Sequence, residues 1–97
     1  MEMKLNTFYL KEIGKLMIGL AERGIDFTLT KVFDGFKVDV PSQDWDAICH
    51  SGSYGGNQAL LEIMGKKLVR NTYDTVEGWL TAEEIFERLD ELEEKGE

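Results

Sequence analysis

The amino-acid sequence predicts an α+β fold, in which helices cover a small antiparallel sheet built from a hairpin and a third strand, in the order α-β-β-β-α-α. Three patterns predict this class: an amphipathic stripe near the N-terminus, two alternating segments around Asp34-Gly35, and a helix-start signal at Thr81. The 97 residues contain no repeat, low-complexity tract or Pro/Ser-rich linker. Residues 1–97 are therefore expected to form a single domain.

The first predicted helix covers residues 7–23, where apolar residues recur at three- and four-residue spacing. Its stripe consists of Tyr9, Ile13, Leu16, Met17 and Leu20. Asn6 is expected to cap the start of the helix, and Gly24 to end it in a left-handed conformation. Gly14 and Gly19 inside the helix each cost up to ~1 kcal/mol relative to alanine, which close packing against another element would explain.

A β-hairpin is predicted in IDFTLTKVFDGFKVDV, because apolar and polar residues alternate on both sides of Asp34-Gly35. A two-residue turn at Asp34-Gly35 sets the expected pairs: Phe33 with Phe36, Lys31 with Val38, and Leu29 with Val40. This register gathers apolar side chains on one face, with Lys31 as the exception. A third strand is expected in WDAICHS (45–51), whose inward face is either Trp45, Ala47 and Cys49 or Ile48 and its neighbours.

The Gly-rich loop after the third strand leads into an apolar segment, for which we predict a helix near residues 57–68. Its buried side would comprise Leu60, Leu61, Met64 and Leu68. Residues 70–79 are expected to be loop, with a short extended piece around Val76–Trp79. The final helix begins after Thr81, where Glu84 completes a capping box and Leu80 and Ile85 form a hydrophobic staple.

The formal net charge of −8 comes entirely from residues 74–97, which carry ten carboxylates against Arg88 and Lys95. Direct binding to nucleic acid or to an anionic membrane is therefore disfavoured, since phosphate contacts require Lys and Arg. A basic protein is the natural partner. No apolar run approaches the ~20 residues that span a bilayer, and the single cysteine agrees with a reducing compartment, so a cytoplasmic location is expected.

The carboxylates of the last helix have two interpretations. They form either a solvated face that keeps the chain soluble, or a surface that offers carboxylates in place of phosphates to a basic groove, as a nucleic-acid mimic would. Glu91, Glu93 and Glu94 lie near the helix C-terminus, where the helix dipole favours cations instead. The residues predicted to bind a protein partner are Tyr54, Glu83, Glu87, Asp90, Glu91 and Glu94.

The segment ICHSGSYGGNQALLEIMG (48–65) suggests an alternative function, the binding of a nucleotide or another small ligand. Its predicted strand–loop–helix context is typical of phosphate-binding loops, but GSYGG matches neither G-x-G-x-x-G nor G-x-x-x-x-G-K-[ST]. The ligand-binding residues would be His50, Ser51, Ser53, Gly55 and Gly56. The competing interpretation is a simple turn in which the glycines supply positive φ angles, with Tyr54 either a recognition anchor or folded back on the core.

Catalytic and metal-binding roles have little support in the sequence. Cys49 and His50 are neighbours on a strand, so their side chains point to opposite faces, and the chain has no second histidine for a proton relay or a Cys/His zinc site. Asp39, Asp44 and Asp46 could bind a hard divalent ion, although DWDAICHSG departs from the calcium-loop pattern and solvated acids are the alternative. We therefore expect no enzyme activity, no cofactor and no metal. A homodimer through an unpaired edge strand is also possible.

The segments WDAICHSGSYGGNQALLEIMG and VEGWLTAEEIFERL resemble small, acidic, uncharacterised proteins encoded by phages and prophages of Gram-positive bacteria. The resemblance covers roughly residues 37–92. These proteins have no assigned activity, so the resemblance implies no catalytic residue. It implies an accessory protein that binds a host or phage protein in the cytoplasm of the host cell.

Overall fold

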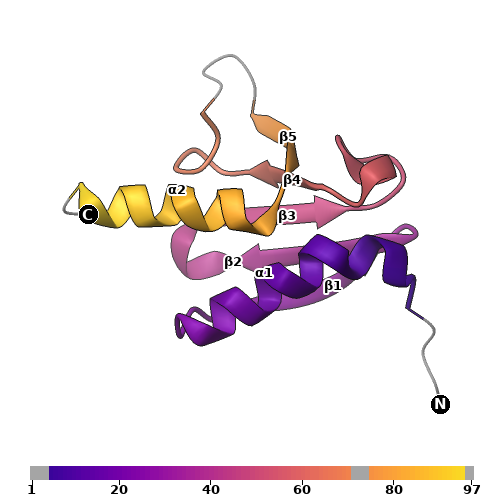
Figure 1. Cartoon of the computed structure of the whole chain (residues 1–97), viewed down its shortest axis with the longest axis horizontal. Helices are drawn as coiled ribbons and strands as arrows, with labels where there is room; N and C mark the ends of the chain where they lie inside the picture. Colours follow the sequence, from indigo (N-terminus) through magenta and orange to yellow (C-terminus); the bar gives the residue numbers. More distant parts are fainter. Residues whose placement is uncertain (1–4, 71–74, 96–97) are drawn as a thin grey trace.

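The computed structural model describes residues 5–70 and 75–95, and within them it confirms the predicted α+β class (Figure 1). Five strands form one open antiparallel sheet, and two helices pack on it. The elements are α1 (Leu10–Glu22), β1 (Thr28–Val32), β2 (Gly35–Val40), β3 (Trp45–Cys49), β4 (Leu61–Met64), β5 (Val76–Leu80) and α2 (Ala82–Glu94). Short 3-10 turns lie at Thr7–Tyr9, Pro41–Gln43 and Gly56–Gln58.

The sheet is a meander, because the strand order β1-β2-β3-β4-β5 is also the order along the chain. Both helices lie on the same face of the sheet, with α1 over β2 and β3 and in contact with α2 (Figure 1). The shortest dimension of the molecule is 19 Å between Cα atoms, which matches two layers. The described residues thus leave the other sheet face uncovered, and we call it the open sheet face.

The hydrophobic core fills the space between the sheet and the helices. Alternate residues of β2, β3 and β4 meet the apolar stripes of both helices there: Ile13, Leu16, Leu20, Phe36, Val38, Val40, Trp45, Ala47, Cys49, Leu61, Ile63, Leu80, Ile85 and Leu89. The first of the two orientations open for β3 is therefore correct, with Trp45, Ala47 and Cys49 facing inward. Neither helix in the described part of the chain combines the length and the apolar content needed to cross a membrane.

The C-terminal end of α1 follows its sequence signal, whereas the helix begins at Leu10, later than predicted, with Tyr9 before it and no side-chain cap of its own. The Asn6 side chain accepts a hydrogen bond from the Phe8 N–H at 3.2 Å, and so caps the 3-10 turn that leads into α1. Gly24 has a φ of 69°, and the Ile25 N–H donates to the Leu20 carbonyl at 2.9 Å to close the helix C-terminus. Gly19 lies directly against the Phe86 ring of α2, where a methyl group would collide.

The predicted hairpin forms, but its register differs from the prediction. Val32 pairs with Gly35, so the turn residues are Phe33 and Asp34, one position earlier than expected. Lys31 consequently pairs with Phe36 and Leu29 with Val38; this shift of two positions leaves both on the helix side of the sheet. Phe33, predicted to face inward, has a φ of 53° and is 85% exposed.

Contacts beyond the hairpin explain this register. A side chain on Gly35 would collide with the Cys49 carbonyl of β3, so glycine is required inside β2 and not in the turn. Asp34 accepts a hydrogen bond from the Ser51 N–H at 3.0 Å, which fixes the turn against the loop after β3.

The prediction of a helix near residues 57–68 is wrong, because this segment contains a 3-10 turn and strand β4. Ala59 with a φ of 61° and Gly65 with a φ of 140° interrupt the backbone on both sides of the strand. Between them Leu61 and Ile63 are buried, whereas Glu62 and Met64 face away from the core. The extended piece around Val76–Trp79 is confirmed as β5, so the order of helices and strands is α-β-β-β-β-β-α.

The start of α2 is held by three side-chain contacts. The Thr81 hydroxyl accepts from the Glu84 N–H at 3.2 Å, and the Glu84 carboxylate accepts from the Thr81 N–H at 3.0 Å, which confirms the capping box. The Ala82 N–H donates to the Glu12 carboxylate of α1 at 2.8 Å. A carboxylate from the first helix therefore completes the N-terminus of the last one.

Candidate functional site

The solvent side of α2 is a dense row of carboxylates, while Ala82, Ile85 and Leu89 anchor the opposite side in the core. The exposed acidic residues are Glu83, Glu84, Glu87, Asp90, Glu91, Glu93 and Glu94. The structure thus brings together all five acids predicted for partner binding.

Two of those five acids are already paired within the chain. Asp90 contacts Arg23 at 2.7 Å, and this guanidinium lowers the pKa of the Asp90 carboxyl. Glu91 contacts Arg70 at 2.6 Å. Glu83, Glu87 and Glu94 form no ion pair within residues 5–70 and 75–95. We call these three the acidic stripe; they span about 16 Å along the helix axis.

Tyr54, the sixth predicted partner-binding residue, is not folded back on the core. Tyr54 is 54% exposed, and its ring stacks on that of Trp79, which is 55% exposed, with centroids 5.7 Å apart and planes 19° from parallel. The Trp79 N–H donates to the Tyr54 carbonyl at 3.2 Å, and Trp79 holds a φ of 58°. Because Trp79 precedes the capping residue Thr81 by two positions, this aromatic pair lies at the N-terminal end of α2.

The close approach of two backbones places the aromatic pair. A side chain on Gly78 would collide with Tyr54, and one on Gly55 would lie 2.9 Å from the Trp79 backbone. Trp79 was not among the residues predicted from sequence. Its only sequence signal is an aromatic residue at the end of the short extended piece predicted around Val76–Trp79.

The residues predicted for small-ligand binding lie together, but they bind one another. The His50 ring accepts from the Gly52 N–H at 3.0 Å. The Ser53 hydroxyl accepts from the His50 N–H at 3.0 Å and donates to the His50 carbonyl at 2.9 Å. Gly55 has a φ of 91°, and a side chain on Gly56 would collide with the His50 carbonyl. The loop is followed by a 3-10 turn and a strand, so the helix start that phosphate binding requires is not there.

Cys49 is completely buried on the helix side of β3, next to the apolar core. Burial, followed by the negative charges of Glu12 and Asp34, raises the pKa of its thiol to about 11. The His50 ring lies 5.0 Å from the Phe33 ring, at the opposite side of the strand. This arrangement favours the neutral thiol and gives the cysteine a structural role.

The thiol of Cys49 is expected to resist modification in the folded protein at pH 8. The thiolate is the reactive form, and both its raised pKa and its burial keep it scarce. Labelling with a thiol reagent, followed by mass spectrometry, should therefore proceed only as fast as the chain unfolds. Addition of denaturant should bring labelling to the rate of a free cysteine; rapid native labelling would contradict the buried position.

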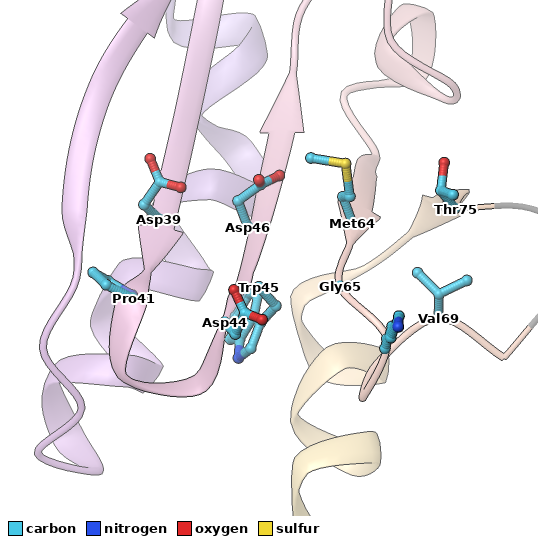
Figure 2. A pocket seen from close by; sticks show the side chains of 10 residues that line it. Asp39, Pro41, Asp44, Trp45, Asp46, Met64, Gly65, Val69 and Thr75 are labelled. Atoms are coloured by element: carbon cyan, nitrogen blue, oxygen red, sulfur yellow. The ribbon is translucent and has the colours of Figure 1, made fainter.

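A groove of about 970 Å³ opens at one end of β2, β3 and β4, and Asp39, Asp44 and Asp46 lie along it (Figure 2). Met64 and Val69 form its apolar wall. Burial raises the pKa of Asp46, while Asp39 pairs with Lys37 at 3.5 Å. Within residues 5–70 and 75–95, no group of three or more His, Cys, Asp or Glu side chains is arranged to hold a metal ion.

Comparisons with known proteins give no family assignment. No protein-family model, no curated protein and no solved structure matches this chain.

Proposed function

We propose that this protein is a non-catalytic interaction protein that binds a basic partner protein through α2. The observation that carries the proposal is the acidic stripe Glu83, Glu87 and Glu94, which projects from a helix whose other side is fixed in the core. A rigid row of carboxylates complements the Lys- and Arg-rich groove of a nucleic-acid-binding protein and would compete there with phosphates.

The charges near the end of α2 also favour a role in binding. Glu91, Glu93 and Glu94 stand in the last turn of α2, which contains no basic residue to complement the helix dipole. Arg23 and Arg70 neutralise Asp90 and Glu91 from neighbouring segments, and Glu84 belongs to the capping box, so the acidic stripe and Glu93 carry the accessible negative charge of α2. The arrangement costs helix stability, so its benefit lies in an interaction outside the chain.

The aromatic pair Tyr54 and Trp79 supplies the apolar part of the same surface. Tyrosine and tryptophan are enriched among residues that dominate binding energy, and their ring faces attract Lys and Arg side chains. The strained backbone of Trp79 holds the indole outside the core. In this proposal the acidic stripe speeds the encounter and the aromatic pair slows dissociation.

The resemblance of residues 37–92 to phage and prophage proteins extends the proposal to the biological setting. We propose an accessory protein of a mobile element that acts in the host cytoplasm on a host or phage protein. The small-ligand alternative is not proposed, because the polar atoms of the 50–57 loop bind one another.

Affinity capture from host lysate, followed by titration of the purified partner at increasing salt, tests this function. Removal of three charges in Glu83→Gln/Glu87→Gln/Glu94→Gln is expected to weaken binding at least about tenfold at low salt, and Tyr54→Ala to raise the dissociation rate. Wild-type affinity should fall steeply as salt screens the charges.

The matched control is Glu22→Gln/Asp26→Asn/Asp44→Asn, which removes the same number of charges from exposed positions outside α2. This variant should bind the partner as the wild type does. A complex that is insensitive to salt, or one weakened equally by both triple variants, would show that the acidic stripe is only a solubilising face.

A further inference from the structure

A second cavity, of about 440 Å³, lies at the end of the molecule where both helices finish. The C-terminal ends of α1 and α2 and the turn between β2 and β3 lie at this end (Figure 1). The cavity shares only Trp45 with the groove beside Asp39, and no residue of the acidic stripe lines it. It is therefore a feature that the proposed function does not use.

The floor of this cavity is apolar and is built from segments far apart in the sequence. It consists of Ile25, Trp45, Leu68, Leu89 and Leu92. The indole N–H of Trp45 donates to the Gln43 side-chain oxygen at 2.9 Å, so the ring has no unsatisfied donor to offer. A cavity of this size with an apolar lining and a few polar groups at its edge is typical of sites for small organic molecules.

The mouth of the cavity is basic, with Arg23, Lys67 and Lys95 against Glu93 alone, in a chain whose net charge is −8. Arg23 pairs with Asp90, and Arg23 and Lys95 directly follow helix C-termini, where cations are favoured in any case. Neither reason applies to Lys67, which follows β4 in a loop and forms no ion pair within residues 5–70 and 75–95. An exposed lysine that lines an apolar cavity lays its methylene stem along the wall and keeps its ammonium group in water. Lys67 thus adds a positive charge at the mouth that nothing in the described chain neutralises.

We propose that this cavity binds a small amphipathic carboxylate of the medium-chain fatty-acid type, with its hydrocarbon chain on the apolar floor and its carboxylate at the mouth beside Lys67. Removal of the hydrocarbon chain from water supplies the affinity, and the basic mouth selects a negative head group over a positive one. The head group stays at the mouth and keeps part of its hydration, which avoids the cost of burying a charge. A basic partner protein would not be attracted to this mouth, so the proposal is independent of the acidic stripe.

Titration with decanoate, below the concentration at which it forms micelles, tests this site. Trp45 lines the cavity, whereas the other tryptophan, Trp79, precedes the opposite end of α2, so Trp79→Phe leaves Trp45 as the reporter of binding. We expect a saturable change in Trp45 emission and, in calorimetry of the wild type, a saturable heat. Decanoate should bind at least about tenfold more tightly than octanoate, because it buries two further methylene groups. It should also bind more tightly than decylamine, which has the same chain length and the opposite charge.

Lys67→Glu is expected to weaken decanoate binding about fivefold, because it replaces an attractive charge at the mouth with a repulsive one. The matched control is Lys66→Glu, which changes the net charge equally at the neighbouring position but lines the groove on the open sheet face. Both lysines are exposed, so circular dichroism should report an intact fold for both variants, and Lys66→Glu should bind decanoate as the wild type does. The absence of a saturable signal, equal weakening by the two variants, or decylamine binding as tight as that of decanoate would overturn the proposal.

Discussion

Replacing Gly35 with alanine is expected to destabilise the protein by about 3 kcal/mol or more, the largest effect predicted for a single methyl group. The added carbon would collide with the Cys49 carbonyl and lie 2.7 Å from the His50 Cβ. Neither can move without opening the ladder between β2 and β3, two inner strands of the sheet. Urea denaturation of wild type and variant measures the difference in free energy of unfolding.

Gly14→Ala is the control for this substitution, since its methyl group enters open space. It should raise stability by up to ~1 kcal/mol through helix propensity alone, when both chains are measured at concentrations where they are monomeric. If the two alanine variants shifted the unfolding midpoint equally, the packing of Gly35 against β3 would be incorrect.

The second large effect is expected from Glu77→Gln, which should destabilise the protein by about 2 kcal/mol at pH 7. Arg88 donates two hydrogen bonds to the Glu77 carboxylate, at 2.8 and 2.6 Å, and a third to the Leu68 carbonyl at 2.8 Å. The Arg88 side chain is only 10% exposed, so loss of the carboxylate leaves a nearly buried guanidinium short of its counter-charge. Thermal unfolding should show a melting temperature lower by about 10 °C.

The pH dependence of this effect follows from the pKa of Glu77, which the Arg88 hydrogen bonds lower from 4.5 to about 2. Because the folded-state pKa is depressed, the carboxylate contributes stability above pH 4.5, and this contribution is lost as pH falls toward 2. The stability difference between wild type and Glu77→Gln should therefore shrink across that window.

Glu83→Gln serves as the matched control, because Glu83 is exposed and belongs to the acidic stripe. Its effect on stability should stay within about 0.5 kcal/mol at every pH. A difference between wild type and Glu77→Gln that did not change between pH 7 and pH 2 would show that the ion pair with Arg88 is not its source.

Local signals predicted most of the fold. The stripe of α1, the left-handed Gly24 and the capping box at Thr81 each depend on residues within one or two helical turns, so the sequence contains the whole cause. The prediction of a helix between Leu60 and Leu68 was wrong because the leucines of this segment fit both helical spacing and strand alternation. The predicted hairpin register was wrong because the actual register depends on contacts outside the hairpin, those of Gly35 with β3 and of Asp34 with Ser51.

The candidate site was likewise predictable from local spacing only in part. Spacing along one helix predicted that Glu83, Glu87 and Glu94 would share the solvent face. It could not predict that Arg23 and Arg70 neutralise two of their neighbours, since those pairs join residues 67 and 21 positions apart. The stacking of Tyr54 on Trp79 likewise depends on the packing of a loop against β5.

The hydrogen bond from the Ala82 backbone to Glu12 has a consequence for synthesis of the chain on the ribosome, because it joins residues 70 positions apart. Each strand of the meander pairs with the one made just before it, so hairpins can form early during translation. The apolar side of α1 and the inner face of the sheet stay partly uncovered until residues 82–94 emerge. A nascent chain stalled before Ala82 would therefore expose apolar surface that is prone to aggregation and accessible to chaperones. Completion of α2 would bury that surface.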